Sequence, residues 1–143
     1  MILVDTNVVS GLRRLDRADA SFAAWARSTP FTDLYVSVIS IQELETGVLM
    51  IERRDPAQGA ILRGWLDNQV LVNFAGRMLP VDLNVAKLCA RLHVPDRRPD
   101  RDALIAATAL AHNLPVATRN VADFAPTGAR LINPWEAGAT PLR

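Results

Sequence analysis

Residues 2–7, Ile-Leu-Val-Asp-Thr-Asn, form the stretch that decides the fold. The three apolar residues favour a short strand, and the polar residues that follow can cap a helix starting near Val8. A strand that passes directly into a helix is the building unit of an α/β domain. Asp5 therefore stands at the carboxyl end of the first predicted strand.

The alternation of strand and helix patterns continues along the chain. Apolar, β-branched runs predict further strands at residues 34–38, 116–118 and 131–132, and an edge strand at 78–81 that contains a proline. Helical spacing of apolar residues predicts helices at residues 18–28, 41–51, 56–69, 83–93 and 103–111. The last of these is apolar on nearly all sides, which predicts burial against a sheet. We therefore expect a single α/β domain over residues 1–143 with a mainly parallel sheet.

Bulk composition excludes several classes of protein. The 143 residues are 50% hydrophobic and carry a formal charge of +1, which is typical of a folded domain with no overall basic field. Cys89 is the only cysteine, so neither an internal disulfide nor a thiolate metal cage can form. No apolar run approaches the roughly 20 residues that a membrane helix needs, and no export signal precedes Asp5. We expect a cytoplasmic protein with no membrane association.

Four acidic residues lie at the ends of predicted elements. Asp5 follows the first strand, Glu43 and Asp102 lie in the first turns of helices, and Asp123 follows the strand at 116–118. Ligands of open α/β sheets gather at the carboxyl ends of the strands. A parallel sheet can therefore bring these four carboxylates to one edge.

Each of these residues also has a purely structural interpretation. Ser40 and Glu43 have the spacing of a capping box, and an acid such as Asp102 is favoured in a first helical turn by the helix dipole. Asp5 can cap the following helix, and Asp123 can shape a turn. A capping role and a metal role are compatible, because a carboxylate can fill one without a cation and the other with it.

Clustered carboxylates indicate a particular chemistry. Mg²⁺ and Mn²⁺ are hard cations that prefer oxygen ligands and keep several waters. Such a site can lower the pKa of a water and neutralise the oxyanions of a phosphodiester under in-line attack. The sequence therefore predicts metal-assisted hydrolysis of a phosphodiester.

Several segments also resemble PIN-domain ribonucleases of the VapC toxin family. The first is I-L-V-D-T-N at residues 2–7, and the next is S-V-I-S-I-Q-E-L-E-T-G, with Glu43 at the acidic position. The similar segments that follow are D-A-L-I-A-A at residues 102–107, A-T-R-N-V-A-D-F at 117–124 and N-P-W at 133–135. The motifs occur in the family's order and cover nearly the whole chain.

The resemblance implies a three-layer α/β/α fold, dependence on Mg²⁺ or Mn²⁺, and endoribonuclease activity that regulates translation. It also implies a cognate antitoxin and a homodimer. The carboxylates that it assigns to the metal and to catalysis are Asp5, Glu43, Asp102 and Asp123. Asp5 and Asp102 are expected to contact the metal directly, and Asp123 partly through water.

Neighbouring polar residues are expected to hold the acidic groups. The resemblance assigns Thr6 and Thr118 to hydrogen bonds with the carboxylates. Asn7 and Asn120 either do the same or shape their turns.

Arginines occur in short clusters that are either solvated faces or local nucleic-acid surfaces. Two clusters are Arg13 with Arg14 and Arg53 with Arg54. A third departs from the family pattern just before the third motif: its Arg97, Arg98 and Arg101 either contact RNA phosphates or pair with Asp96 and Asp100. Asp102, and not Asp100, is taken as the carboxylate of the site because it directly precedes Ala-Leu-Ile-Ala-Ala.

Other functions fit the sequence less well. An aspartyl-phosphate phosphatase would have a second aspartate where Asn7 stands, and a phosphoacceptor module would have a late lysine, whereas Lys87 is the only lysine. A catalytically silent PIN-like module that binds RNA or a partner remains the alternative, although all four acidic positions are filled. Phe22 and Trp25 are candidates for an antitoxin groove, for dimer contacts or for the core.

Overall fold

The computed structural model describes residues 1–139 and contains a five-stranded sheet with the order β3-β2-β1-β4-β5. Every pairing in this sheet is parallel. The strands are β1 (Ile2–Val4), β2 (Leu34–Ser37), β3 (Met78–Leu79), β4 (Val116–Ala117) and β5 (Leu131–Ile132). The expected mainly parallel sheet is confirmed.

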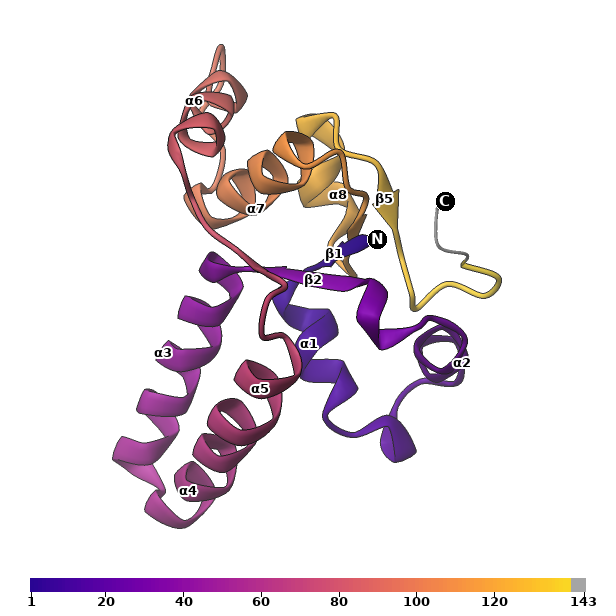
Figure 1. Cartoon of the computed structure of the whole chain (residues 1–143), viewed down its shortest axis with the longest axis vertical. Coiled ribbons are helices and arrows are strands. Elements are labelled where there is room, and N and C mark those ends of the chain that lie inside the picture. The colour runs from indigo at the N-terminus through magenta and orange to yellow at the C-terminus, as the bar shows by residue number, and fades with distance from the viewer. Residues whose placement is uncertain (140–143) are drawn as a thin grey trace.

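Helices cover both faces of the sheet and give the three layers that were expected (Figure 1). On one side lie α6 (Leu83–Leu92), α7 (Asp100–Ala111) and α8 (Val121–Phe124). The other side carries α1 (Thr6–Leu12), α2 (Ala20–Ser28), α3 (Val38–Arg54), α4 (Pro56–Trp65) and α5 (Leu71–Asn73). Helices α3 and α4 form a long hairpin that projects from the sheet (Figure 1). Among the described residues, no helix is long and apolar enough to cross a membrane.

The central strand β1 is buried on both faces, and its side chains divide between two cores. Ile2 and Val4 belong to the cluster that includes Phe22 and Trp25, whereas Leu3 packs with Ile105 of α7. Successive side chains of a strand point to opposite faces, which explains the division. The sheet therefore fixes the position of Asp5 from both sides.

Phe22 and Trp25 are core residues, with only 0% and 2% of their surfaces exposed. The Phe22 ring also stacks on Trp135, with 4.4 Å between ring centroids. Both side chains are buried, so of the three interpretations weighed for them the core is confirmed.

The second strand is one residue shorter than predicted, and this changes the start of the next helix. The strand ends at Ser37, whose hydroxyl accepts a hydrogen bond from the Ile39 amide at 3.0 Å and caps α3. Val38 is therefore helical and not part of the strand. Ser40 is buried inside the first turns of α3, so the capping-box interpretation of Ser40 and Glu43 is wrong.

Other element boundaries shift for local reasons. The helix predicted from residue 18 begins at Ala20, because the Asp19 carboxylate caps it. The helix predicted to end at residue 69 continues through a π-helical turn, Leu66–Val70, into α5. The strands predicted at 78–81 and 116–118 each contain only two residues, and Thr118 lies just beyond β4.

Replacing Gly59 with alanine should destabilise the fold by about 2 kcal/mol, because the new methyl group would overlap backbone. A Cβ built at Gly59 of α4 lies 2.5 Å from the Cα of Glu52 on α3. Gly47→Ala is the matched control, since a Cβ there meets nothing within 4 Å and alanine favours a helix by up to about 1 kcal/mol. Urea unfolding of both variants measures the difference, and equal stabilities would contradict the close packing of α3 and α4.

Candidate active site

The carboxylate of Asp5 is buried at the carboxyl end of β1 and is held by three hydrogen bonds. Its Oδ1 accepts from the Thr6 amide at 2.8 Å, which caps α1. Its Oδ2 accepts from the Thr118 hydroxyl at 2.7 Å and from the Asn7 side-chain amide at 3.3 Å. Only 4% of the residue surface is exposed. The position of this carboxylate is thus set by groups that follow β1 and β4.

The loop after β4 is tied to the loop after β1 by further hydrogen bonds. The Thr118 hydroxyl accepts from the Asn120 backbone amide at 3.0 Å while it donates to Asp5. The Asn7 side-chain oxygen accepts from the Arg119 amide at 3.3 Å. Asn120 takes part through its backbone and directly precedes α8, whereas Asn7 contacts the carboxylate directly.

Glu43 reaches the same edge of the sheet from α3. Its Oε1 accepts a hydrogen bond from the Thr6 hydroxyl at 3.1 Å, and its Oε2 lies 3.7 Å from Arg101 on α7. Thr6 therefore uses its amide on Asp5 and its hydroxyl on Glu43. One short segment after β1 positions two of the acidic side chains.

Asp102 and Asp123 complete the acidic group. Asp102 lies in the first turn of α7, and its pKa is raised by burial and then by the negative charges of Asp5, Asp123 and Glu43, against a smaller opposing effect of Arg101. Asp123 is exposed in the first turn of α8. The structure thus brings Asp5, Glu43 and Asp123 within electrostatic reach of Asp102.

Burial has the largest effect on Asp5 and raises the pKa of this carboxyl above 3.8. The hydrogen bonds from Thr118 and Thr6 act in the opposite direction, and the charge of Asp123 adds to the increase. Accumulated like charge of this kind is relieved when a cation binds.

The chemistry of these side chains fits a hard divalent cation. The four candidate metal ligands all offer carboxylate oxygens, and within residues 1–139 neither thiolate nor imidazole accompanies them at this edge of the sheet. Among the described residues, however, no three His, Cys, Asp or Glu side chains are grouped closely enough to hold a metal ion as they stand. Carboxylate oxygens as such suit an ion that keeps several waters, as Mg²⁺ does.

The arginines before the third motif are mostly paired within the protein. Arg97 donates to Asp100 at 3.2 Å, and the Arg98 side chain donates to the Leu92 carbonyl at 3.0 Å. Of this cluster only Arg101 reaches the acidic group, through Glu43. For Arg97 the interpretation as a local ion pair with Asp100 agrees with the structure.

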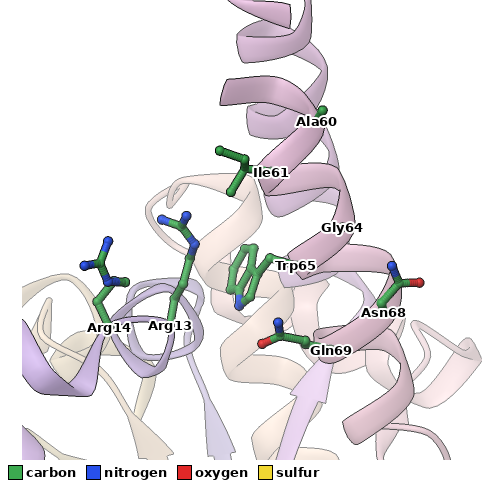
Figure 2. Close-up of a pocket in the computed structure, with 8 residues that line it drawn as sticks. All are labelled: Arg13, Arg14, Ala60, Ile61, Gly64, Trp65, Asn68 and Gln69. Carbon is green, nitrogen blue, oxygen red and sulfur yellow. The ribbon is translucent and has the colours of Figure 1, made fainter. Parts of the chain in front are cut away.

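A large open hollow lies away from the carboxylates, between the end of α1 and the α4 helix (Figure 2). Its volume is about 510 Å³, and the Arg13 guanidinium lies 6.0 Å from the centre of the Trp65 ring within it. Figure 2 shows Arg14 beside Arg13 and farther from Trp65. This hollow contains no acidic side chain, so its chemistry differs from that of the acidic site.

The stability of the metal-free protein should depend on pH through Asp102. A carboxyl whose pKa is raised on folding binds more protons in the folded state than in the unfolded state. The free energy of unfolding therefore decreases as pH rises from 3.8 through the raised pKa. We expect the parent protein to lose stability relative to Asp102→Asn over this range. Urea unfolding of both proteins in EDTA at several pH values measures the difference, and a constant difference would contradict the raised pKa.

Sequence comparison identifies the class of protein. The family model for the PIN domain matches residues 2–126, and the chain belongs to this family. It is 36% identical to the VapC ribonuclease Y4jK of Sinorhizobium fredii, over 95% of this chain and 99% of that protein. It is 35% identical to the toxin FitB of Neisseria gonorrhoeae, over 94% of this chain and 99% of FitB.

A solved structure gives the same result for the fold. The crystal structure of FitAcB from Neisseria gonorrhoeae contains a chain that aligns with a TM-score of 0.86 and 35% identity. The alignment covers 95% of this protein and 99% of that chain. The PIN-like three-layer fold is therefore confirmed.

Proposed function

We propose that the protein is a metal-dependent endoribonuclease that hydrolyses RNA phosphodiester bonds at the site of Asp5, Glu43, Asp102 and Asp123. One observation carries the proposal: the buried Asp5 carboxylate, which Thr118 fixes, lies with Glu43 and Asp123 close enough to Asp102 for their charges to raise its pKa. The relative from Sinorhizobium fredii is named a ribonuclease. This similarity favours an enzyme over the catalytically silent binding module.

The residues of the site have separate tasks in the proposed reaction. Asp5 and Asp102 would bind Mg²⁺ or Mn²⁺ directly, with Glu43 and Asp123 completing the site directly or through water. When bound, the ion activates a water and neutralises charge on the phosphate. Thr118 and Thr6 hold the carboxylates in place, so that little rearrangement is needed when RNA binds. Arg101 partly offsets the acidic charge beside Glu43.

Cleavage of a mixed cellular RNA pool by the purified protein tests the activity. We expect discrete fragments with Mg²⁺ or Mn²⁺ and none with EDTA. Fragments of equal yield in EDTA would exclude the metal-dependent mechanism. A pool that stays intact with both ions would count against the nuclease itself.

We further propose that the nuclease is the toxin of a toxin–antitoxin pair, acts in the cytoplasm and forms a homodimer. The similarity to the toxin FitB over nearly the full length supports this role. Expression of the protein alone should stop growth, and co-expression with the product of the neighbouring reading frame should restore growth and yield a stable complex. If neither happens, the toxin proposal fails while the nuclease proposal stands. Light scattering after size-exclusion chromatography measures the oligomeric state.

A further inference from the structure

A second hollow begins beside the acidic site and follows α1 away from it. Its volume is about 500 Å³. We call it the arginine groove and define it by Asn7, Ser10, Arg14, Arg17, Arg119 and Trp135. At one end Asn7 donates a hydrogen bond to the Asp5 carboxylate. A ligand in the groove would therefore reach the reacting centre.

The groove contains cations that the protein itself does not neutralise. Arg14, Arg17 and Arg119 are all exposed, and within residues 1–139 only Arg14 has an acidic partner, an exposed Asp16 at 3.8 Å. The one acid that lines the groove, Asp19, is occupied in capping α2. Arg97, in contrast, is already paired with an acid. The positive charge available to an anionic ligand thus comes from the segment after α1 and from the loop after β4.

Arg119 is held in place without losing its hydrogen-bonding capacity. Its guanidinium lies 5.3 Å from the centre of the Trp135 ring, and Trp135 also stacks on Phe22. The backbone amide of Arg119 donates to Asn7, which links the position of this arginine to the active site. The Trp135 ring thus already packs against Phe22 and Arg119. With three arginines lining it, the groove is suited to phosphates.

We propose that single-stranded RNA flanking the bond to be cut lies in the arginine groove, with its phosphates against Arg14, Arg17 and Arg119. The proposal rests on the proposed nuclease function and adds a route for the substrate. Contacts to phosphates position a strand without reading its sequence. The groove should therefore strengthen binding of different RNA sequences to the same extent.

Salt-dependent binding of labelled oligouridylate and oligoadenylate tests the groove, with the Asp102→Asn protein in EDTA to prevent cleavage. Each phosphate contact to a single strand contributes about 0.7 to the slope of log Kd against log salt. Adding Arg14→Ser and Arg17→Ser should lower this slope by about 1.4, and Kd at about 0.1 M salt should rise about 25-fold for both RNAs. The single change Arg119→Gln should lower the slope by about 0.7.

Arg53→Ser with Arg54→Ser is the matched control, with the same change of charge at the far end of α3. Arg53 is ten residues beyond Glu43, or about 15 Å along the helix axis, and this pair should leave the slope and Kd unchanged. Thermal unfolding confirms that every variant is folded.

A groove variant that binds both RNAs like the control would overturn the proposal, as would a loss confined to one RNA. Normal RNA binding with loss of the antitoxin complex would assign the groove to a protein partner, and this too would overturn it. None of these results depends on catalysis. If the parent protein cleaves RNA but the groove variants bind RNA as tightly as the control, the groove proposal alone is refuted. If the parent protein does not cleave RNA, the nuclease proposal is refuted.

Discussion

Replacing Asp102 with asparagine should lower metal-dependent RNA cleavage by about 1000-fold while leaving the fold at least as stable as before. A carboxylate that contacts the metal supports several kcal/mol of charge stabilisation, and about 4 kcal/mol corresponds to this factor. The charge that is removed is unfavourable in the metal-free fold, because burial and three neighbouring acids raise the pKa of Asp102. Loss of activity together with unchanged or increased stability is the signature of a functional carboxylate.

Asp100→Asn is the matched control for this experiment. Asp100 is in the same first turn of α7, but its carboxylate faces Arg97 at 3.2 Å. Its loss should change cleavage by no more than about twofold, and the helix dipole predicts a stability cost below about 1 kcal/mol. Initial rates with Mg²⁺ and thermal unfolding in EDTA measure both variants. Equal rates for Asp102→Asn and the parent protein would refute the assignment of the site.

Thr118→Val should have the second-largest effect, on both stability and activity. The substitution removes the buried hydroxyl that donates to Asp5 and accepts from the Asn120 amide. A buried hydrogen bond to a charged group contributes about 2 kcal/mol to stability. Removal of a group that positions a metal ligand lowers activity by about 10- to 100-fold.

A pH profile separates a positioning role of Thr118 from a general loss of structure. The hydroxyl lowers the pKa of Asp5, so without it this pKa rises and the acid limb of the rate profile moves to higher pH. Thr118→Ser keeps the hydroxyl and should restore the profile, with a stability cost of about 0.8 kcal/mol for the lost methyl group. A uniform decrease in rate at every pH would indicate a structural role only.

The parts of the site that depend on local sequence could be predicted, and the parts that depend on distant contacts could not. An apolar run that ends in Asp5 is readable because a buried strand and its terminus occupy adjacent residues. The hydrogen bond between Asp5 and Thr118 joins residues 113 positions apart. No spacing rule indicates such a pair, and only the family resemblance pointed to Thr118.

The error at Ser40 and the open alternatives at Phe22 have different physical causes. Ser37 and Ser40 are both able to cap a helix, and the choice depends on where β2 leaves the sheet, which is set by its pairing with β3. An apolar helix face does not reveal what covers it. Phe22 is covered by Trp135, which lies far along the chain.

The sequence alone does not distinguish Arg119, although this residue stands between Thr118 and Asn120 in one of the motifs that resemble the family. Its importance emerges from the stacking on Trp135 and the contact with Asn7, both of which depend on tertiary structure. The exposed arginines of the segment after α1 are equally ambiguous in the sequence. Within residues 1–139, Arg17 forms no ion pair with an acid, whereas Arg97 pairs with Asp100, and sequence clustering does not reveal this difference.

The position of β1 in the sheet has a consequence for protein synthesis. This strand comprises residues 2–4, but it lies in the middle of the sheet and pairs on one side with β4, at residues 116–117. During synthesis, Asp5 leaves the ribosome long before Thr118 and Asp123 are translated. The acidic centre is therefore assembled only after Thr118 and Asp123 have been translated and have left the ribosome. An RNA-cutting enzyme built in this way stays inactive until the ribosome has passed these codons.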